Sequence, residues 1–438
     1  MPTQIGVGSA GVWSPFWVQN GAAFGAGVGT NMLTEQANMT YVPNATLAHP
    51  YYDATTNPNP HWMKIDMNTA GVTTLAVTDA GFATNPPDST RRWGHVKRFL
   101  FYKDGNPTSA APLAENSGKF KVATDGYLEI SIGSITYRSI SALPTGSAYE
   151  VELWFITMDS SGAFLLGRDG LYAIQIVARI NTNPGGAPAL STIMNVLDEQ
   201  NTSVGHLQFE VGDIATHGAV NFYYSNFYGP NWEDADAPYG ATRVEEYIPT
   251  ADYAGHDGFT GTFADWDEAG PDDTTTKQIG PVGTTAVDDV SETVANGAGG
   301  TSGVTASDAV ICANTVWRAV QPTADAKGSS VSFYHAVHDG TTLAKRNCSP
   351  NATNWGSQSR FWRTDPSAAA WAQAALANWK TGAAYDTVVV SPTARHFSAV
   401  RGYVAWVKAG EEYAAVPAIV RGDPPFPRRP IRNLLVTR

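Results

Sequence analysis

The chain has 438 residues and a formal net charge of −12, and only 16% of its residues are charged. Its 42 glycines and 27 prolines are spread along the whole sequence, which excludes a long coiled coil or a helical bundle and favours many short strands joined by turns. The negative charge argues against a non-specific nucleic-acid binder, and no run of about 18 apolar residues predicts a membrane-spanning helix, so we expect neither nucleic acid nor membrane insertion.

The N-terminal segment, residues 1–45, is rich in glycine, and its first 34 residues contain no ionisable side chain. It lacks the basic and apolar regions of a secretory signal peptide. Two interpretations stay open: an anchor that docks on a partner, or a first pair of strands that belongs to the next domain. On the anchor interpretation, the candidate assembly contacts are Trp13, Phe16 and Trp17.

Residues 46–235 are predicted to form the first domain, because turns alternate there with short segments of period-two hydrophobicity. Asp125-Gly126 and Thr145-Gly146 mark turns, and clear alternating strands follow at 127–132 and 149–155. Further strands are expected at 171–176, 206–211 and 221–227. Strands at this spacing, with no intervening helices, predict an antiparallel β-sandwich rather than a parallel sheet.

One strand of this domain carries a pair of acids. Glu150 and Glu152 are two residues apart, so both side chains would point to the same face. Paired carboxylates are what a glycosidase needs, but Phe155 stands where sandwich-type glycosidases carry a third acid. We interpret the pair as polar residues on the outer face of a half-buried strand. We therefore predict no catalytic residue and keep a polysaccharide hydrolase as the less favoured alternative.

A dense group of aromatic residues follows where the sandwich meets a loop. Flat rings can stack on sugar faces, and the candidate glycan-binding residues are Tyr223, Tyr224, Tyr228 and Trp232. Packing in the core or between domains explains such residues equally well.

The negative net charge lies entirely between residues 231 and 300, where there are 15 acidic residues and only two basic ones, Arg243 and Lys277. The acidic runs at 233–236 and 265–268 could bind calcium, a cation that takes oxygen ligands. Neither run has the spacing of a calcium loop, so we expect this stretch to form solvated loops between two sandwiches.

Residues 236–420 are predicted to form a second β-sandwich with one short helix. Strands are expected from about residue 308, at 309–313, 331–337 and 398–407. The helix is expected to begin at a cap on Thr364 or Asp365 and to end at Gly382. Trp371 and Trp379 would then share the helix face that packs on a sheet.

Other reactive residues of the second domain have structural explanations. His335 and His338 could suggest a metal site, but their segment is predicted to be a strand that ends in a hairpin corner at His338. Cys312 lies in an apolar run and is interpreted as a buried small residue, and spacing does not decide whether it pairs with Cys348. Nucleophile-elbow and phosphate-binding motifs are missing, so we predict no cofactor and no metal.

The C-terminal segment, residues 421–438, is rich in proline and contains five arginines. It is either an arm that extends onto a neighbour or a solvated terminus. On the first interpretation, its assembly contacts are Arg428, Arg429 and Arg432.

Two parts of the first domain resemble laminin-G-like, concanavalin-like jelly rolls. Residues 123–130 are similar to the family's DG-x-L strand, and residues 141–153 are similar to the S-x-x-L-x-x-G-x-W/Y segment that follows. Residues 221–229 are similar to the closing strand, with Asn226 near the family's usual acid. The resemblance implies a jelly-roll fold for this domain.

The second half resembles a module found in virion proteins of tailed phages, where it follows a laminin-G-like module. The similar stretches are 266–275, 364–376 and 404–407. The resemblance implies a non-enzymatic component of the particle: a head decoration, a collar protein, or a tail fibre or appendage. We therefore expect synthesis in the host cytoplasm, a place on the outer surface of the virion, and other virion proteins and copies of itself, in a trimer, as partners. An adhesin that binds a host surface glycan is the alternative.

Overall fold

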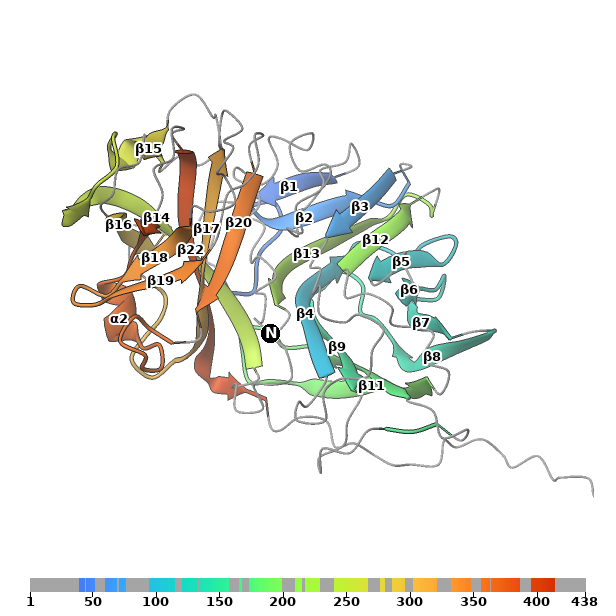
Figure 1. The fold of residues 1–438 in the computed structure, drawn as a ribbon. Helices are drawn as coiled ribbons and strands as arrows, with labels where there is room; N and C mark the ends of the chain where they lie inside the picture. The colour runs from blue at the N-terminus through green and yellow to red at the C-terminus, as the bar shows by residue number, and fades with distance from the viewer. Residues whose placement is uncertain are drawn as a thin grey trace, which may run out of the picture.

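The computed structural model describes residues 39–43, 45–51, 60–68, 71–75, 94–114, 120–132, 134–156, 165–167, 173–198, 209–214, 217–228, 240–266, 276–279, 286–295, 302–320, 332–347, 356–362, 364–386 and 395–413. These residues form antiparallel sheets that build two β-sandwiches side by side (Figure 1). The predicted all-β class with two tandem sandwiches is confirmed.

The first sandwich contains a seven-stranded sheet. Its strands, in spatial order, are β1 (Met39–Pro43), β2 (Pro60–Asp66), β13 (Asn221–Tyr228), β4 (Gly94–Lys103), β9 (Tyr149–Ile156), β10 (Ile174–Asn181) and β11 (Leu190–Asp198). A four-stranded sheet faces it and consists of β5 (Ala111–Ala114), β6 (Phe120–Val122), β7 (Tyr127–Ile132) and β8 (Ile135–Ala142). Two more strands, β3 (Gly71–Leu75) and β12 (Phe209–Ile214), pair with each other.

The first core lies between the seven-stranded and four-stranded sheets. Phe101 and Val151 of the larger sheet belong to the same buried cluster as Leu128 and Ile130 of β7. In β7, buried residues alternate with more exposed ones, so the period-two pattern that predicted this strand is confirmed.

The second sandwich is a nine-stranded sheet that curls on itself. Eight strands follow the order β19 (Leu343–Asn347), β18 (Ser332–His338), β21 (Lys380–Asp386), β16 (Val287–Ala295), β14 (Gly240–Asp257), β22 (Arg395–Glu412), β17 (Ala309–Val320) and β20 (Gly356–Trp362), and β15 (Lys277–Ile279) pairs with β22. Trp317 and Phe397 from one end of this order pack with Phe333 and Tyr385 from the other end in one buried cluster. The two halves of the sheet therefore face each other across a core.

The acidic stretch does not consist of solvated loops in its described part, and that prediction is wrong. It supplies β14, β15 and β16, and β14 alone spans 18 residues between β16 and β22. The physical reason lies in the two basic residues of the stretch. Lys277 and Arg243 are both buried and bind carboxylates inside the module, so these acids need not face water.

The predicted helix is present but much shorter than expected. The helix α2 spans only Gln373–Ala377, and its N-cap is Ala372. Asp365 does not cap it, because its carboxylate accepts the Ala369 N–H at 2.9 Å within a tight turn where Ala368 has φ of 65°. Trp371 and Trp379 do contact each other, with ring centroids 5.6 Å apart, but they flank the helix instead of sharing one of its faces.

Gly382 lies in β21 and does not end the helix. A Cβ atom at this position would lie 2.0 Å from the backbone oxygen of Asp289 on β16. The close approach of two backbones therefore requires glycine here.

The two sheets that dominate the sandwiches share no strand, since one is built from residues 39–228 and the other from residues 240–412. The exact domain boundaries remain predictions. Across the described ranges, no helix has both the length and the apolar character needed to cross a membrane. The candidate assembly residues lie outside the described residues: Trp13, Phe16, Trp17, Arg428, Arg429 and Arg432.

Candidate functional site

The acidic pair of β9 is buried, and the prediction that it lies on a solvated outer face is wrong. Val151 and Leu153 point into the first core, while Glu150 and Glu152 point to the opposite face of the sheet. That face is covered by the second sandwich, because Tyr413 at the end of β22 packs in one cluster with Trp154. Glu150 and Glu152 are only 2% and 0% exposed, so neither can reach a polysaccharide in this arrangement.

Glu152 is the centre of a charged cluster within the first sandwich. Its carboxylate forms a salt bridge with Arg98 of β4 and accepts the Nε–H of Arg179 of β10 at 2.7 Å. Trp154 donates its indole N–H to the same carboxylate at 3.1 Å. We call Arg98, Glu152, Trp154 and Arg179 the Glu152 cluster. Since all four side chains are buried, the carboxylate balances two guanidinium groups away from water.

Tyr413 links this surface to the second sandwich. Its hydroxyl donates to Glu150 and accepts the amide N–H of Asn181 at 3.0 Å. The guanidinium of Arg98 lies 5.4 Å from the centre of the Tyr413 ring. One tyrosine of the second module thus contacts three buried polar residues of the first.

An arginine of the second module also contacts the first module. Arg243 of β14 donates a hydrogen bond to Oε1 of Glu411 at 3.0 Å, and its second terminal nitrogen forms an ion pair with Oε2 at 2.8 Å. Its guanidinium also lies 4.5 Å from the ring centre of Tyr51, which lies between β1 and β2 of the first sandwich, and 5.1 Å from that of Trp406. We call Tyr51, Arg243, Trp406 and Glu411 the Arg243 clasp. Arginine suits this position because it can pair with a carboxylate and stack on rings at the same time.

Apolar contacts continue across the same boundary. Val316, Ala399 and Tyr403 of the second sheet belong to the cluster that forms the first core. Buried polar and apolar contacts therefore form the interface between the two sandwiches. The Glu152 cluster and the Arg243 clasp belong to this interface.

The predicted glycan platform is only partly available. Tyr224 is fully buried, with its hydroxyl donating to the Leu113 carbonyl at 3.0 Å, so its assignment to an exposed platform is wrong. Tyr223 points to the other face of β13, is only partly buried, and meets Tyr102 edge-on at 5.2 Å between ring centroids. The side chain of Tyr228 and all of Trp232 lie outside the described residues.

The two histidines of β18 do not converge. Being three residues apart on a strand, they point to opposite faces. His335 stacks on Trp317 with ring centroids 3.8 Å apart, and burial lowers its pKa well below the usual value. His338 lies beside His256 and ends the strand at a hairpin, as predicted. Cys312 is buried, as the apolar run predicted.

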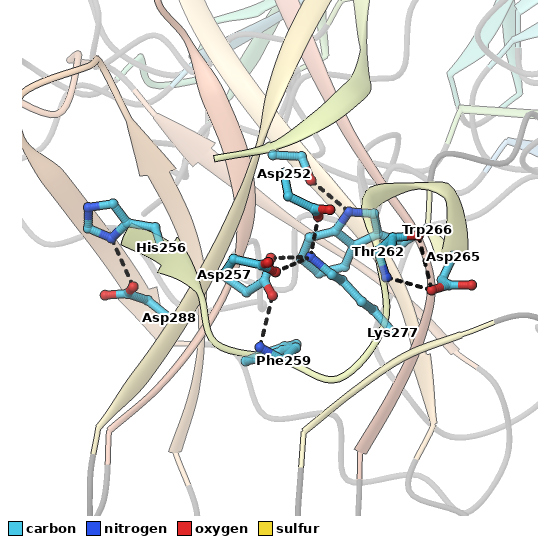
Figure 2. A network of polar contacts seen from close by, with 11 residues as sticks. Asp252, His256, Asp257, Phe259, Thr262, Asp265, Trp266, Lys277 and Asp288 are labelled. Atoms are coloured by element: carbon cyan, nitrogen blue, oxygen red, sulfur yellow. Dashed lines mark hydrogen bonds and ion pairs between the residues drawn. The ribbon is translucent and has the colours of Figure 1, made fainter. Parts of the chain in front are cut away.

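A compact ionic site lies in the acidic stretch, around Lys277 of β15 (Figure 2). Its ammonium lies 2.7 Å from Asp252, 3.1 Å from Asp257 and 2.7 Å from Asp289. These carboxylates are the one group of three potential metal-ligating side chains within the part of the chain that the structure describes. We call the four residues the Lys277 cluster. The lysine ammonium stands where a metal cation would have to bind.

The Lys277 cluster is buried on one side and open on the other. Lys277 and Asp289 have fully buried side chains, whereas Asp252 and Asp257 are 25% and 42% exposed. The lysine also lies over the Trp266 ring, 4.6 Å from its centre. Burial raises the pKa of Asp289 to about 7, although the nearby ammonium acts against this. Burial acts to lower the pKa of Lys277, but the three carboxylates raise it above its ordinary value.

The acidic run at 265–268, considered as a calcium ligand set, has a different role where it is described. Asp265 accepts the backbone N–H of Thr262 at 2.6 Å and so caps a short 3₁₀ turn, η1 (Phe263–Asp265). Trp266 is fully buried and donates its indole N–H to Ser291. Sequence reasoning missed the Lys277 cluster and the Arg243 clasp. The available signal was the presence of just two basic residues in a stretch of 15 acids.

No protein-family model and no curated protein matches this sequence. Among solved structures, the chain is similar to the metal-free form of lectin I-B4 from Griffonia simplicifolia, at 10% identity over 44% of this chain and 93% of that chain, with a TM-score of 0.26. It is also similar to the binding domain of botulinum neurotoxin DC in complex with rat synaptotagmin II, at 8% identity over 87% and 94% of the two chains, with a TM-score of 0.27. A bifunctional GH43-CE protein of Bacteroides eggerthii matches 43% of this chain at 10% identity and a TM-score of 0.25, and the match spans only 26% of that protein. At TM-scores this low, these similarities do not indicate a function for the chain.

Proposed function

We propose that the protein is a non-enzymatic structural component of a tailed-phage particle, located on the outer surface of the virion. The observation that carries this proposal is the joint between the two sandwiches, where Tyr413 covers the acidic pair of β9. Glu150, one of the two carboxylates that suggested a hydrolase, binds Tyr413 of the second module, which suits a rigid building block better than an enzyme.

The order of the modules supports the same proposal. The sequence resembles a laminin-G-like module followed by a module of phage virion proteins, and the two sandwiches follow each other in that order along the chain. Rigid packing between the two sandwiches gives a single body that can contact one neighbour through each sandwich.

The test is the presence of this chain in purified native particles. We expect it to co-sediment with the particles and to appear by cryo-electron microscopy as two-lobed density on the head, collar or tail. A trimer in solution, measured by light scattering after size-exclusion chromatography, is the expected free form. Recovery of the chain only in the soluble fraction of the lysate, with no density on the particle, would contradict the proposal.

The basic arm gives a second test of assembly. Replacing Arg428, Arg429 and Arg432 together by alanine should reduce incorporation into particles, because the arm would lose three of its five arginines. Lys121 and Arg138 lie exposed on the first sandwich and offer a matched control in the double alanine variant. Equal incorporation of both variants would remove the arm from the assembly contacts.

A particle adhesin that binds a host glycan is the second candidate. The observation in its favour is the Tyr102–Tyr223 pair, which lies on the sheet face opposite the first core and is only partly buried. Lys64 faces Tyr223 across the strand pair, so polar and aromatic groups are neighbours there. Such a combination fits a sugar, whose ring has apolar faces and hydroxyl edges.

A glycan array probed with the oligomer tests this candidate. Binding that is lost in Tyr223→Ala and kept in Tyr137→Ala would support it, since Tyr137 is a partly buried tyrosine of the other sheet. An array without hits for the oligomer would rule the adhesin out.

A further inference from the structure

The Lys277 cluster places an amine against a carboxyl group inside the protein. Lys277 Nζ lies 2.7 Å from Oδ1 of Asp289, and both side chains are fully buried. The two residues come from β15 and β16, which do not pair with each other: β15 pairs with β22, and β16 pairs with β14 and β21. The contact is therefore made by side chains alone.

We propose that Lys277 and Asp289 become joined by an intramolecular amide bond between Nζ of the lysine and the side-chain carboxyl carbon of the aspartate. The lysine nitrogen attacks this carbon, a C–N bond forms, and the C–Oδ1 bond breaks. An ammonium and a carboxylate are consumed, and an amide and one water molecule are produced. Atoms and charge balance without an oxidant or any other reactant.

The second oxygen of Asp289 is held in a way that assists this step. Oδ2 accepts the backbone N–H of Phe259 at 2.9 Å. Negative charge gathers on this oxygen when the nitrogen adds to the carbon, and a fixed N–H donor stabilises such charge. The donor is part of the backbone, so it is in place before the reaction begins.

Asp252 and Asp257 are placed to move the protons. Each lies within hydrogen-bond distance of Nζ (Figure 2), and each is partly exposed, unlike Lys277 and Asp289. One of them can take the proton that the ammonium must lose and deliver it to the departing oxygen. Two acceptors on the same nitrogen allow proton removal while the third carboxyl group, that of Asp289, is attacked.

Burial favours the protonation state that the reaction requires of Asp289, whereas the three carboxylates raise the pKa of Lys277 and keep it an ammonium, so its proton has to pass to Asp252 or Asp257 before the nitrogen attacks. Burial raises the pKa of Asp289 to about 7, so the acid form, which is the better acceptor of the nitrogen, is accessible near neutral pH. Well-oriented groups in one molecule react as if present at about 10⁵ M or more. The complete burial of the Lys277 and Asp289 side chains also disfavours the reverse reaction, because hydrolysis needs a water molecule at the amide carbon.

The bond would fasten the short strand β15 to the middle of the second sheet. This inference goes beyond the proposed function and does not depend on it. A covalent bond inside the second module would serve a structural particle protein and a particle adhesin equally well.

The mass of the purified full-length protein under denaturing conditions tests the proposal. We expect it to be lower by one water molecule than the mass calculated from the sequence, after allowance for the initiator methionine. Trypsin gives the position: in an unmodified chain it cuts after Lys277 and releases peptides 244–277 and 278–318. In the cross-linked chain this cut fails, and one peptide, 244–318, remains, lighter by one water molecule.

Cyclisation of an Asp-Gly pair, such as Asp257-Gly258, also removes one water molecule, so a second digestion is needed. Protease Asp-N cuts the backbone before Asp288, and the peptides that contain Lys277 and Asp289 should stay joined after this cut. Cyclisation would instead leave them separate. A wild-type mass equal to the calculated one, or separate peptides after the cut, would overturn the proposal.

Two variants complete the experiment. Lys277→Arg keeps the positive charge but cannot form this amide, so its mass should equal the calculated value. Asp288→Asn is the matched control, because Asp288 is the neighbouring acid, contacts His256 at 2.9 Å and lies outside the Lys277 cluster. It should keep the loss of water. A loss of water that persists in Lys277→Arg would place the modification elsewhere and refute the assignment.

Discussion

Removing the carboxylate of Glu152 should destabilise the protein strongly. The side chain is completely buried and forms salt bridges with Arg98 and Arg179. In Glu152→Ala, the two buried guanidinium groups lose the carboxylate that balances them. Breaking a buried ion pair in this way costs about 3–5 kcal/mol. Since folded domains are stable by about 5–15 kcal/mol, the loss would be a large part of the total.

The assay is urea unfolding followed by tryptophan fluorescence, with the transition of the first sandwich fitted separately if the modules unfold in two steps. Glu129→Ala is the matched control, because Glu129 also lies on a strand of the first sandwich but its salt bridge with Arg138 is exposed to solvent. Exposed pairs of this kind contribute little. Equal unfolding midpoints for the two variants would refute the argument that Glu152 balances buried charge.

Three further predictions concern the second module. Gly382→Ala should lower the free energy of unfolding by about 1–3 kcal/mol or more, because the added Cβ would collide with the backbone of β16. Gly105→Ala is the control: a Cβ there would make only an ordinary van der Waals contact, so the unfolding midpoint should change little. His335 should make the protein less stable as the pH falls below about 6.5, because burial lowers its pKa in the folded state and protonation therefore favours the unfolded chain. His335→Gln should flatten this part of the curve of unfolding free energy against pH. An unchanged slope would contradict the attribution of this pH dependence to His335. Arg243→Lys should lower the free energy of unfolding by about 1–2 kcal/mol, because lysine keeps the charge but cannot make the two-point contact with Glu411. An unchanged urea unfolding midpoint would show that the two-point geometry does not contribute to stability.

Local pattern was enough to predict the class of the fold and many strands. In β7 the alternation of apolar and polar residues matches the alternation of buried and more exposed side chains, because one face of this strand is open to solvent. The same rule failed for β9. Its polar residues alternate correctly, but the face they occupy is covered by Tyr413 and its neighbours from a distant part of the chain.

The helix shows a related limit. The residues around Asp365 satisfy the rules for a helix start, yet the same carboxylate can cap a tight turn, and that is the bond it makes. Local sequence offered both outcomes. In the folded chain the tight turn is followed by the contact between Trp371 and Trp379, and the second tryptophan lies directly before β21.

The sequence by itself determined that the protein is built from antiparallel strands, that it is acidic, and that Lys277 and Arg243 are isolated cations in an acidic stretch. Only the tertiary structure decided which acids these cations bind, because Asp289 and Glu411 come from other strands or from more than 150 residues away in the chain. Burial and charge pairing depend on such distant contacts. Because of these contacts, the acidic pair that was predicted to lie on the surface is buried at the interface between the sandwiches. The acidic stretch that was predicted to form loops contains the candidate site of a covalent bond.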